Sequence, residues 1–139
     1  MSVFRDIAAA LDSRLNSMSG KPPIAWENKA YEPTMGTLYA RPTLIPGDTV
    51  QATLGDSGTD MNIGIYQIDI FAEAGTGKGA AITMADTIAN HFKRGTDLTY
   101  NSRTVRIKSV SRQAGINNPD GWYQLPIEII YVSYTEART

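Results

Sequence analysis

A glycine-rich segment from Gly75 to Gly79 is the strongest candidate for a chemical site in this sequence. It joins an alternating hydrophobic segment to one with helical spacing, which is where phosphate-binding loops lie in nucleotide-binding proteins. Such a loop needs Ser or Thr directly after its Lys, but Gly79 follows Lys78. The Glu73 carboxylate would also repel phosphate. We therefore interpret the segment as a turn between a strand and a helix.

The single histidine, His91, and a few acidic residues are the remaining candidates for acid–base or metal chemistry. A general base needs a nucleophile or an orienting carboxylate, and no sequence pattern places either one beside His91, which favours a packing or capping role. Asp56 and Asp60 lie in a polar loop, while Asp69 and Glu73 share one face of a strand at a spacing that keeps them apart. Calcium loops instead place oxygen ligands at every second residue. The sequence predicts no catalytic residue, cofactor or metal site.

Composition excludes several further classes of function. The chain has 139 residues, of which 42% are hydrophobic, and 13 basic residues against 14 acidic ones give a net charge of -1, unlike a dedicated nucleic-acid binder. It has no Cys, which excludes disulfides and Cys-based zinc sites. No window approaches the ~20 apolar residues of a membrane-spanning helix, and the first residues lack a secretory signal pattern. We expect one domain over residues 1–139, located in a cytosol, with no membrane partner.

Two segments have the apolar spacing of three and four residues that is typical of amphipathic helices. The first covers residues 3–18, with Ser2 placed to cap its start and Gly20 placed to end it. The second covers residues 81–92 and is followed by two cations and Gly95, which are ordinary signals for the end of a helix. The proline-containing segment of residues 21–26 between the first helix and the sheet is predicted to be an extended connector.

Five strands are expected around these helices. Residues 37–54 are predicted to form two strands joined by a turn at Pro46-Gly47-Asp48, with Pro42 favouring a sheet edge or a bulge. The other strands are residues 62–73, 104–112 and 122–135. Ile63 and Ile65 break the alternation of the first of these, which indicates a bulge near Ile65 or a strand covered on both faces. The order predicts an α+β fold with a mixed or mostly antiparallel sheet and two main helices on one face.

The last strand carries apolar residues on both of its faces. If Ile127, Ile129 and Tyr131 fill the core, the intervening residues Ile130, Val132 and Tyr134 point the other way and need a cover of their own. Two helices in so small a chain cover only one face well. The second face is therefore covered either by the first helix together with the connector of residues 22–32 or by another subunit, and the sequence leaves both possibilities open.

Several segments together resemble the tail terminator (minor tail U-like) proteins of long-tailed phages. The segments that carry the resemblance are Pro23-Ile24-Ala25-Trp26-Glu27-Asn28, Tyr31-Glu32-Pro33, Leu38-Tyr39-Ala40-Arg41, Ile65-Tyr66-Gln67-Ile68-Asp69-Ile70 and Trp122-Tyr123. The resemblance covers nearly the whole chain. It implies an α+β subunit of a hexameric ring that caps the tail tube, stops its polymerisation and provides the surface to which the head is joined. The implied partners are other copies of the chain, the tail tube protein and head-neck connector proteins, in a virion tail assembled in the bacterial cytoplasm.

Ring and tube contacts are expected at sheet edges and in the glycine-rich loop from Gly55 to Met61. The predicted interface residues are Arg41, Asp56, Ser57, Asp60, Met61, Glu73, Lys78, Arg103 and Arg106. Trp26, Tyr31 and Pro33 match the family pattern, and their predicted role is to hold the connector onto the sheet. Two alternatives remain at this point: a head-closure or neck connector protein of the same virion, and a small nucleotide-binding enzyme that uses residues 75–79.

Overall fold

The computed structural model describes residues 2–53 and 58–136 and has two helices and a six-stranded antiparallel sheet. The helices are α1 (Val3–Asn16) and α2 (Gly79–His91). The strands are β1 (Tyr39–Gln51), β2 (Thr59–Glu73), β3 (Asp97–Tyr100), β4 (Arg103–Arg112), β5 (Ile116–Asn117) and β6 (Trp122–Glu136). This arrangement confirms the predicted α+β class.

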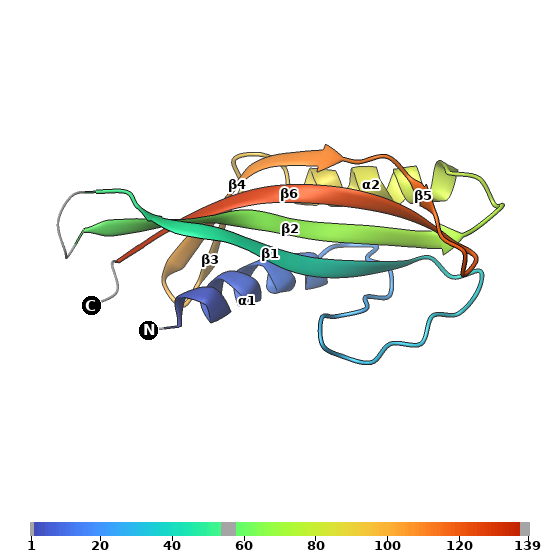
Figure 1. Ribbon diagram of the computed structural model, residues 1–139, viewed down its shortest axis with the longest axis horizontal. Coiled ribbons are helices and arrows are strands. Elements are labelled where there is room, and N and C mark those ends of the chain that lie inside the picture. The colour runs from blue at the N-terminus through green and yellow to red at the C-terminus, as the bar shows by residue number, and fades with distance from the viewer. Residues whose placement is uncertain (1, 54–57, 137–139) are drawn as a thin grey trace.

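The sheet is built around two long central strands that run along the long axis of the molecule (Figure 1). The strand order is β1-β2-β6-β4-β3, and β5 pairs with β6 beside the end of β4. Strands β2 and β6 pair without a register shift from Thr59 opposite Glu136 to Glu73 opposite Trp122. Because the side chains of paired residues project to the same face, this register determines which residues of the two strands lie together.

Both helices pack on one face of the sheet, which we call the helix face. One buried cluster joins Leu11 and Leu15 of α1, Ile88 of α2, and Ile68 and Ile129 of the central strands. On β2 the even-numbered side chains from Tyr66 to Ala72 enter this core, and on β6 the odd-numbered ones do. The prediction of two helices on one face, with Ile127, Ile129 and Tyr131 directed into the core, is confirmed.

The prediction of a turn at Pro46-Gly47-Asp48 is wrong, because β1 continues through these residues as a single strand with a bulge. The register with β2 shifts between Pro46 and Thr49, so Gly47 and Asp48 together lie opposite Ile63 and β1 has one extra residue there. A side chain at Gly47 would place its Cβ only 2.6 Å from the carbonyl oxygen of Ile63, so glycine is needed for this close approach. The bulge predicted near Ile65 is therefore in the opposite strand. Residues 68–72 of β2 are covered on both faces, as the other alternative predicted.

Strand β1 lies at the edge of the sheet, as Pro42 predicted, and its outer side is closed along residues 40–46. The backbone N–H of Ala40 donates to the Pro23 carbonyl at 3.0 Å, and Leu44 donates to the Glu27 carboxylate at 2.6 Å. Residues 42 and 46 also direct their backbone nitrogen away from β2, but both are prolines and have no N–H to donate. The connector and two prolines therefore prevent another strand from pairing here.

Candidate assembly surfaces

The face of the sheet opposite the helices carries a row of apolar side chains at the end where β2 begins and β6 ends. The register places these residues of three adjacent strands side by side on this face. We call the set the apolar stripe, and it consists of Ile45, Val50, Met61, Ile63, Ile65, Ile130, Val132 and Tyr134. Tyr134 is 58% exposed, and Ile45, Val50 and Ile63 are between 37% and 43% exposed. Apolar side chains gathered on one uncovered face of a sheet are typical of a protein–protein interface.

Charged and polar residues border the apolar stripe. On β6 the same face continues from the stripe into Glu128 in one direction and Glu136 in the other. On the β4 side, Arg106 lies opposite Val132 and donates two hydrogen bonds to the Asp97 carboxylate, at 2.8 and 2.9 Å. This guanidinium lowers the pKa of Asp97 from its ordinary value, so the pair stays ionised at neutral pH. The surface thus has an apolar centre and a charged border.

A hollow of about 220 Å³ lies where the stripe meets this border. Its lining comes from three strands and consists of Asp97, Thr104, Arg106, Val132 and Tyr134. Val132 is only 4% exposed, while its neighbour Tyr134 is largely exposed. The hollow therefore has an apolar floor and a cation on its rim.

The connector covers the other end of the same face. Tyr31 lies 5.1 Å from Tyr39, and Tyr39 stacks on Phe71 at 4.8 Å and meets the edge of Trp122 at 5.1 Å, all between ring centroids. The guanidinium of Arg41 lies 4.8 Å from the centroid of the Phe71 ring. The connector thus covers the aromatic end of the second face, as the first alternative predicted, but the first helix lies on the other face. The apolar stripe is left uncovered, and its cover by another subunit stays a prediction.

The three predicted connector residues have different environments. Tyr31 packs on the aromatic cluster of the face opposite the helices, while Trp26 is half-buried against the core on the helix face. Pro33 is exposed. Tyr31 and Trp26 therefore contact opposite sides of the sheet, and the chain between them wraps around the β1 edge.

On the helix face, an apolar groove lies between α1 and the bulge of β1. Its volume is about 320 Å³, and Phe4, Ile7, Leu44, Pro46 and Tyr131 are among its lining residues. Phe4 is 58% exposed at the rim of the groove. Tyr131 is 2% exposed and lies on the buried side of the groove. The same end of the molecule therefore exposes apolar side chains on both faces.

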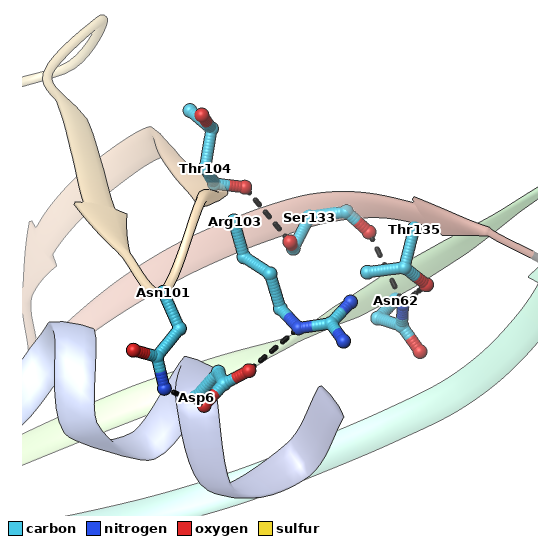
Figure 2. Close-up of polar contacts among 7 residues, drawn as sticks. All are labelled: Asp6, Asn62, Asn101, Arg103, Thr104, Ser133 and Thr135. Carbon is cyan, nitrogen blue, oxygen red and sulfur yellow. Dashed lines mark hydrogen bonds and ion pairs between the residues drawn. The ribbon is translucent and has the colours of Figure 1, made fainter. Parts of the chain in front are cut away.

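Arg103, one of the predicted interface residues, is engaged within the chain. Its Nε donates to the buried carboxylate of Asp6 at 2.6 Å, and Asn101 donates to the same carboxylate at 3.0 Å (Figure 2). The pKa of Asp6 lies below its ordinary value, mainly because of the hydrogen bond from Arg103 and secondly because of that from Asn101. The contacts fasten the first turn of α1 to the β3–β4 hairpin, which explains the position of α1 at this end of the sheet.

A second polar cluster supports the sheet behind the apolar stripe. The Asn62 side chain donates to the Ser133 carbonyl at 3.2 Å and to the Thr135 hydroxyl at 2.8 Å, and the Ser133 hydroxyl donates to the Thr104 carbonyl at 2.8 Å (Figure 2). Thr49, just after the bulge, donates to the carboxamide oxygen of Asn62 at 2.8 Å. These bonds link β1, β2, β6 and β4, and so hold the strands that carry the stripe in fixed register.

The remaining predicted interface residues are spread over both ends of the molecule. Met61 belongs to the apolar stripe, and Asp60 precedes it on β2. Glu73 and Lys78 lie at the far end of β2 and beside α2, away from the stripe. Asp56 and Ser57 lie outside the described residues.

Residues 75–79 and His91, considered above for chemistry, take part in local structure. Gly75 and Gly77 have φ near +85°, and the Thr76 hydroxyl donates to the Glu73 carbonyl at 2.6 Å, which closes the turn before α2. His91 Nε2 lies 2.7 Å from the Arg14 carbonyl oxygen at the end of α1. Within residues 2–53 and 58–136, no group of three His, Asp or Glu side chains is placed to share a metal ion. Neither described helix is long and apolar enough to cross a membrane.

Part of the stripe is predictable from the sequence, and part is not. The alternation in β6 indicates Ile130, Val132 and Tyr134. The turn predicted within β1 prevented Ile45 and Val50 from being assigned to the same sheet face. The parity of Ile63 and Ile65 was the available signal for β2, since both point to the face that the helices leave uncovered.

Comparisons with known proteins agree with this architecture. A family model described as phage tail terminator protein matches residues 6–131. One solved structure superposes on this chain with a TM-score of 0.76. The two sequences are 20% identical and the match covers 96% of each chain, which shows a shared fold. No curated protein matches the sequence significantly. The chain belongs to the phage tail terminator family, a family of structural proteins, and is a component of a phage tail.

Proposed function

We propose that the chain forms a hexameric ring on the completed end of the phage tail tube. The ring stops further polymerisation of the tube and provides the surface to which the head is joined. The observation that carries this proposal is the apolar stripe, an uncovered apolar sheet face in a member of the tail terminator family. The chain works as one domain over residues 1–139, by contact with its neighbours and without catalysis, cofactor or metal.

The composition of the stripe supports a role in assembly. Burying a large aliphatic or aromatic side chain contributes about 1.5–3 kcal/mol, so several exposed apolar residues on one face supply a substantial driving force for association. The charged border, with Glu128, Glu136 and Arg106, suits the rim of such an interface and disfavours unspecific aggregation.

The partners follow from the position of such a ring. Copies of the chain lie on either side, the tail tube protein lies below, and head-neck connector proteins lie above, in a virion assembled in the bacterial cytoplasm. The net charge of -1 suits a ring through which DNA passes without being held, so we propose no specific nucleic-acid binding and no membrane partner.

Deletion of the gene tests the proposal. Particles without the protein should have tails of irregular length and no attached heads, and complementation should restore both properties. Purified protein should bind one end of isolated tail tubes, and negative-stain images should show six-fold rings. Tails of normal length in the deletion would contradict the role of the protein as terminator, and binding on the portal side alone would identify a neck connector.

A further inference from the structure

The first turns of α1 present an exposed surface at the same end of the molecule as the apolar stripe but on the opposite face. Phe4 is 58% exposed and Arg5 is exposed beside it, and the half-buried Ala8 and Ala9 follow one turn later. The small alanine side chains allow another surface to approach the helix closely. Figure 1 shows the start of α1 and the end of β6 at the same end of the sheet.

The hollow beside Val132 matches the exposed side chain of Phe4 in size and chemistry. Its volume is about 220 Å³, and an apolar cavity of about 150 Å³ is enough to hold benzene. The guanidinium of Arg106 lies on its rim, where it can contact the face of an aromatic ring. A phenyl group entering the hollow would bury the exposed side of Tyr134 as well.

The charges beside the two surfaces are complementary. Arg5 follows Phe4 on the exposed side of α1, and Glu136 lies two residues beyond Tyr134 on the same face of β6. If Phe4 of one molecule enters the hollow of another, the cation of Arg5 meets a border that carries a carboxylate. Opposite charges at the rim favour the correct register of two surfaces over alternatives.

We infer that Phe4 of one subunit inserts into the hollow formed by Arg106, Val132 and Tyr134 of a second copy, with Arg5 beside Glu136 of that copy. This inference rests on the proposed ring and identifies its subunit interface. The two surfaces lie on opposite faces of one molecule, so each subunit uses one to contact the copy before it and the other to contact the copy after it. Such a head-to-tail interface closes into a ring when the rotation per subunit allows it.

Cysteine cross-linking tests this arrangement directly, because the natural chain has no Cys. Phage carrying a deletion of the gene would be complemented with Arg5→Cys and Glu136→Cys variants, expressed alone, as a mixture or as the double variant, with Asp86→Cys on α2 as control. We expect the mixture to give a disulfide-linked dimer and the double variant to give a ladder up to the closed ring on non-reducing gels. Dimers from Glu136→Cys alone would show a symmetric interface and overturn the inference, as would the lack of cross-links in fully assembled tails.

Substitutions at Phe4 give an independent measurement. Phe4→Ala should weaken self-association about ten- to a hundred-fold, while Phe4→Leu should have a smaller effect. Arg5→Glu should weaken association, and adding Glu136→Arg should restore it. Thermal unfolding of the isolated variants verifies that they are folded. If Phe4→Ala still terminates tails and associates normally, this inference fails while the proposed function stands; if wild-type protein does not terminate tails, the proposed function itself fails.

Discussion

Arg14 and His91 exchange hydrogen bonds between the ends of the two helices. The Arg14 guanidinium donates to the His91 carbonyl oxygen at 3.0 and 2.8 Å, and the imidazole Nε2 of His91 donates to the Arg14 carbonyl oxygen at 2.7 Å. Carbonyl groups at a helix end lack partners within the helix, and the Arg14 guanidinium supplies one to the His91 carbonyl. The Arg14 carbonyl accepts from His91 in addition to the Ser17 hydroxyl. This contact fixes α1 and α2 relative to each other on the sheet.

Replacing Arg14 should therefore destabilise the fold. We expect Arg14→Ala to lower the free energy of unfolding by about 1.5–3 kcal/mol, because hydrogen bonds from a charged group are lost. Arg14→Lys should recover only part of this loss, since an ammonium group cannot reproduce the planar two-point contact. Urea denaturation measures the change, with the exposed Arg94→Ala as control. Equal stability of the Arg14→Ala and Arg94→Ala variants would contradict a structural role for the contact.

Gly64 and Tyr131 should show strong coupling. A Cβ at residue 64 would lie 2.5 Å from the Tyr131 hydroxyl oxygen and 2.8 Å from the Ile45 carbonyl oxygen, so Gly64→Ala should destabilise the protein by about 1–3 kcal/mol. Tyr131→Phe removes the hydroxyl contact but keeps the ring carbon Cζ, 2.8 Å from that Cβ, so it should recover part of the loss. A double-mutant cycle in urea measures the coupling, and strictly additive effects would show that the sheet relaxes without involving Tyr131.

The ion pair between Asp6 and Arg103 should make stability depend on acid pH. The pKa of Asp6 is lowered in the folded state, so its contribution is present above the unfolded value of about 3.8 and is lost as the pH falls through the folded value. The Tm of the wild type should exceed that of Asp6→Asn at pH 7, and the difference should shrink below about pH 4. The exposed Asp97→Asn variant serves as comparison. A difference in Tm that persists unchanged at pH 2 would contradict this account.

The closed edge of β1 predicts how aggregation can be induced. Replacing Pro42 and Pro46 by Thr, together with Glu27→Ala, would restore or free three outward backbone N–H groups. We expect this triple variant to form strand-paired aggregates that bind thioflavin T, whereas Glu27→Ala alone should lose about 1 kcal/mol of stability at most and remain dispersed. A triple variant that is folded and does not aggregate would show that the edge is protected in another way.

The helices and the general arrangement of the sheet could be predicted from sequence because each depends on a local period. The spacing of Ile7, Leu11 and Leu15 defines the buried side of α1, and the recurrence of Leu125, Ile127 and Ile129 at every second residue defines the core side of β6. The predicted caps were less informative, since the Ser2 side chain makes no capping hydrogen bond.

The features that the sequence analysis missed depend on contacts between distant residues. Pro46-Gly47-Asp48 has the composition of a turn, and only the close approach of Gly47 to Ile63 makes it a bulge. Strands β3 and β5 have four and two residues, too few for a periodic pattern. Likewise, no local pattern indicates that Arg103 pairs with Asp6, which lies 97 residues before it.

The central claim is that the apolar stripe is an assembly surface of a tail terminator, and a matched pair of substitutions tests it. Ile45 in the stripe and Ile116 on β5 are both isoleucines on strands, 42% and 47% exposed. The measurement is the distribution of tail lengths, by electron microscopy, in a gene deletion complemented with Ile45→Asp or Ile116→Asp, after both variants are shown to fold. We expect irregular, headless tails with Ile45→Asp and normal tails with Ile116→Asp; normal tails with both variants would contradict the claim.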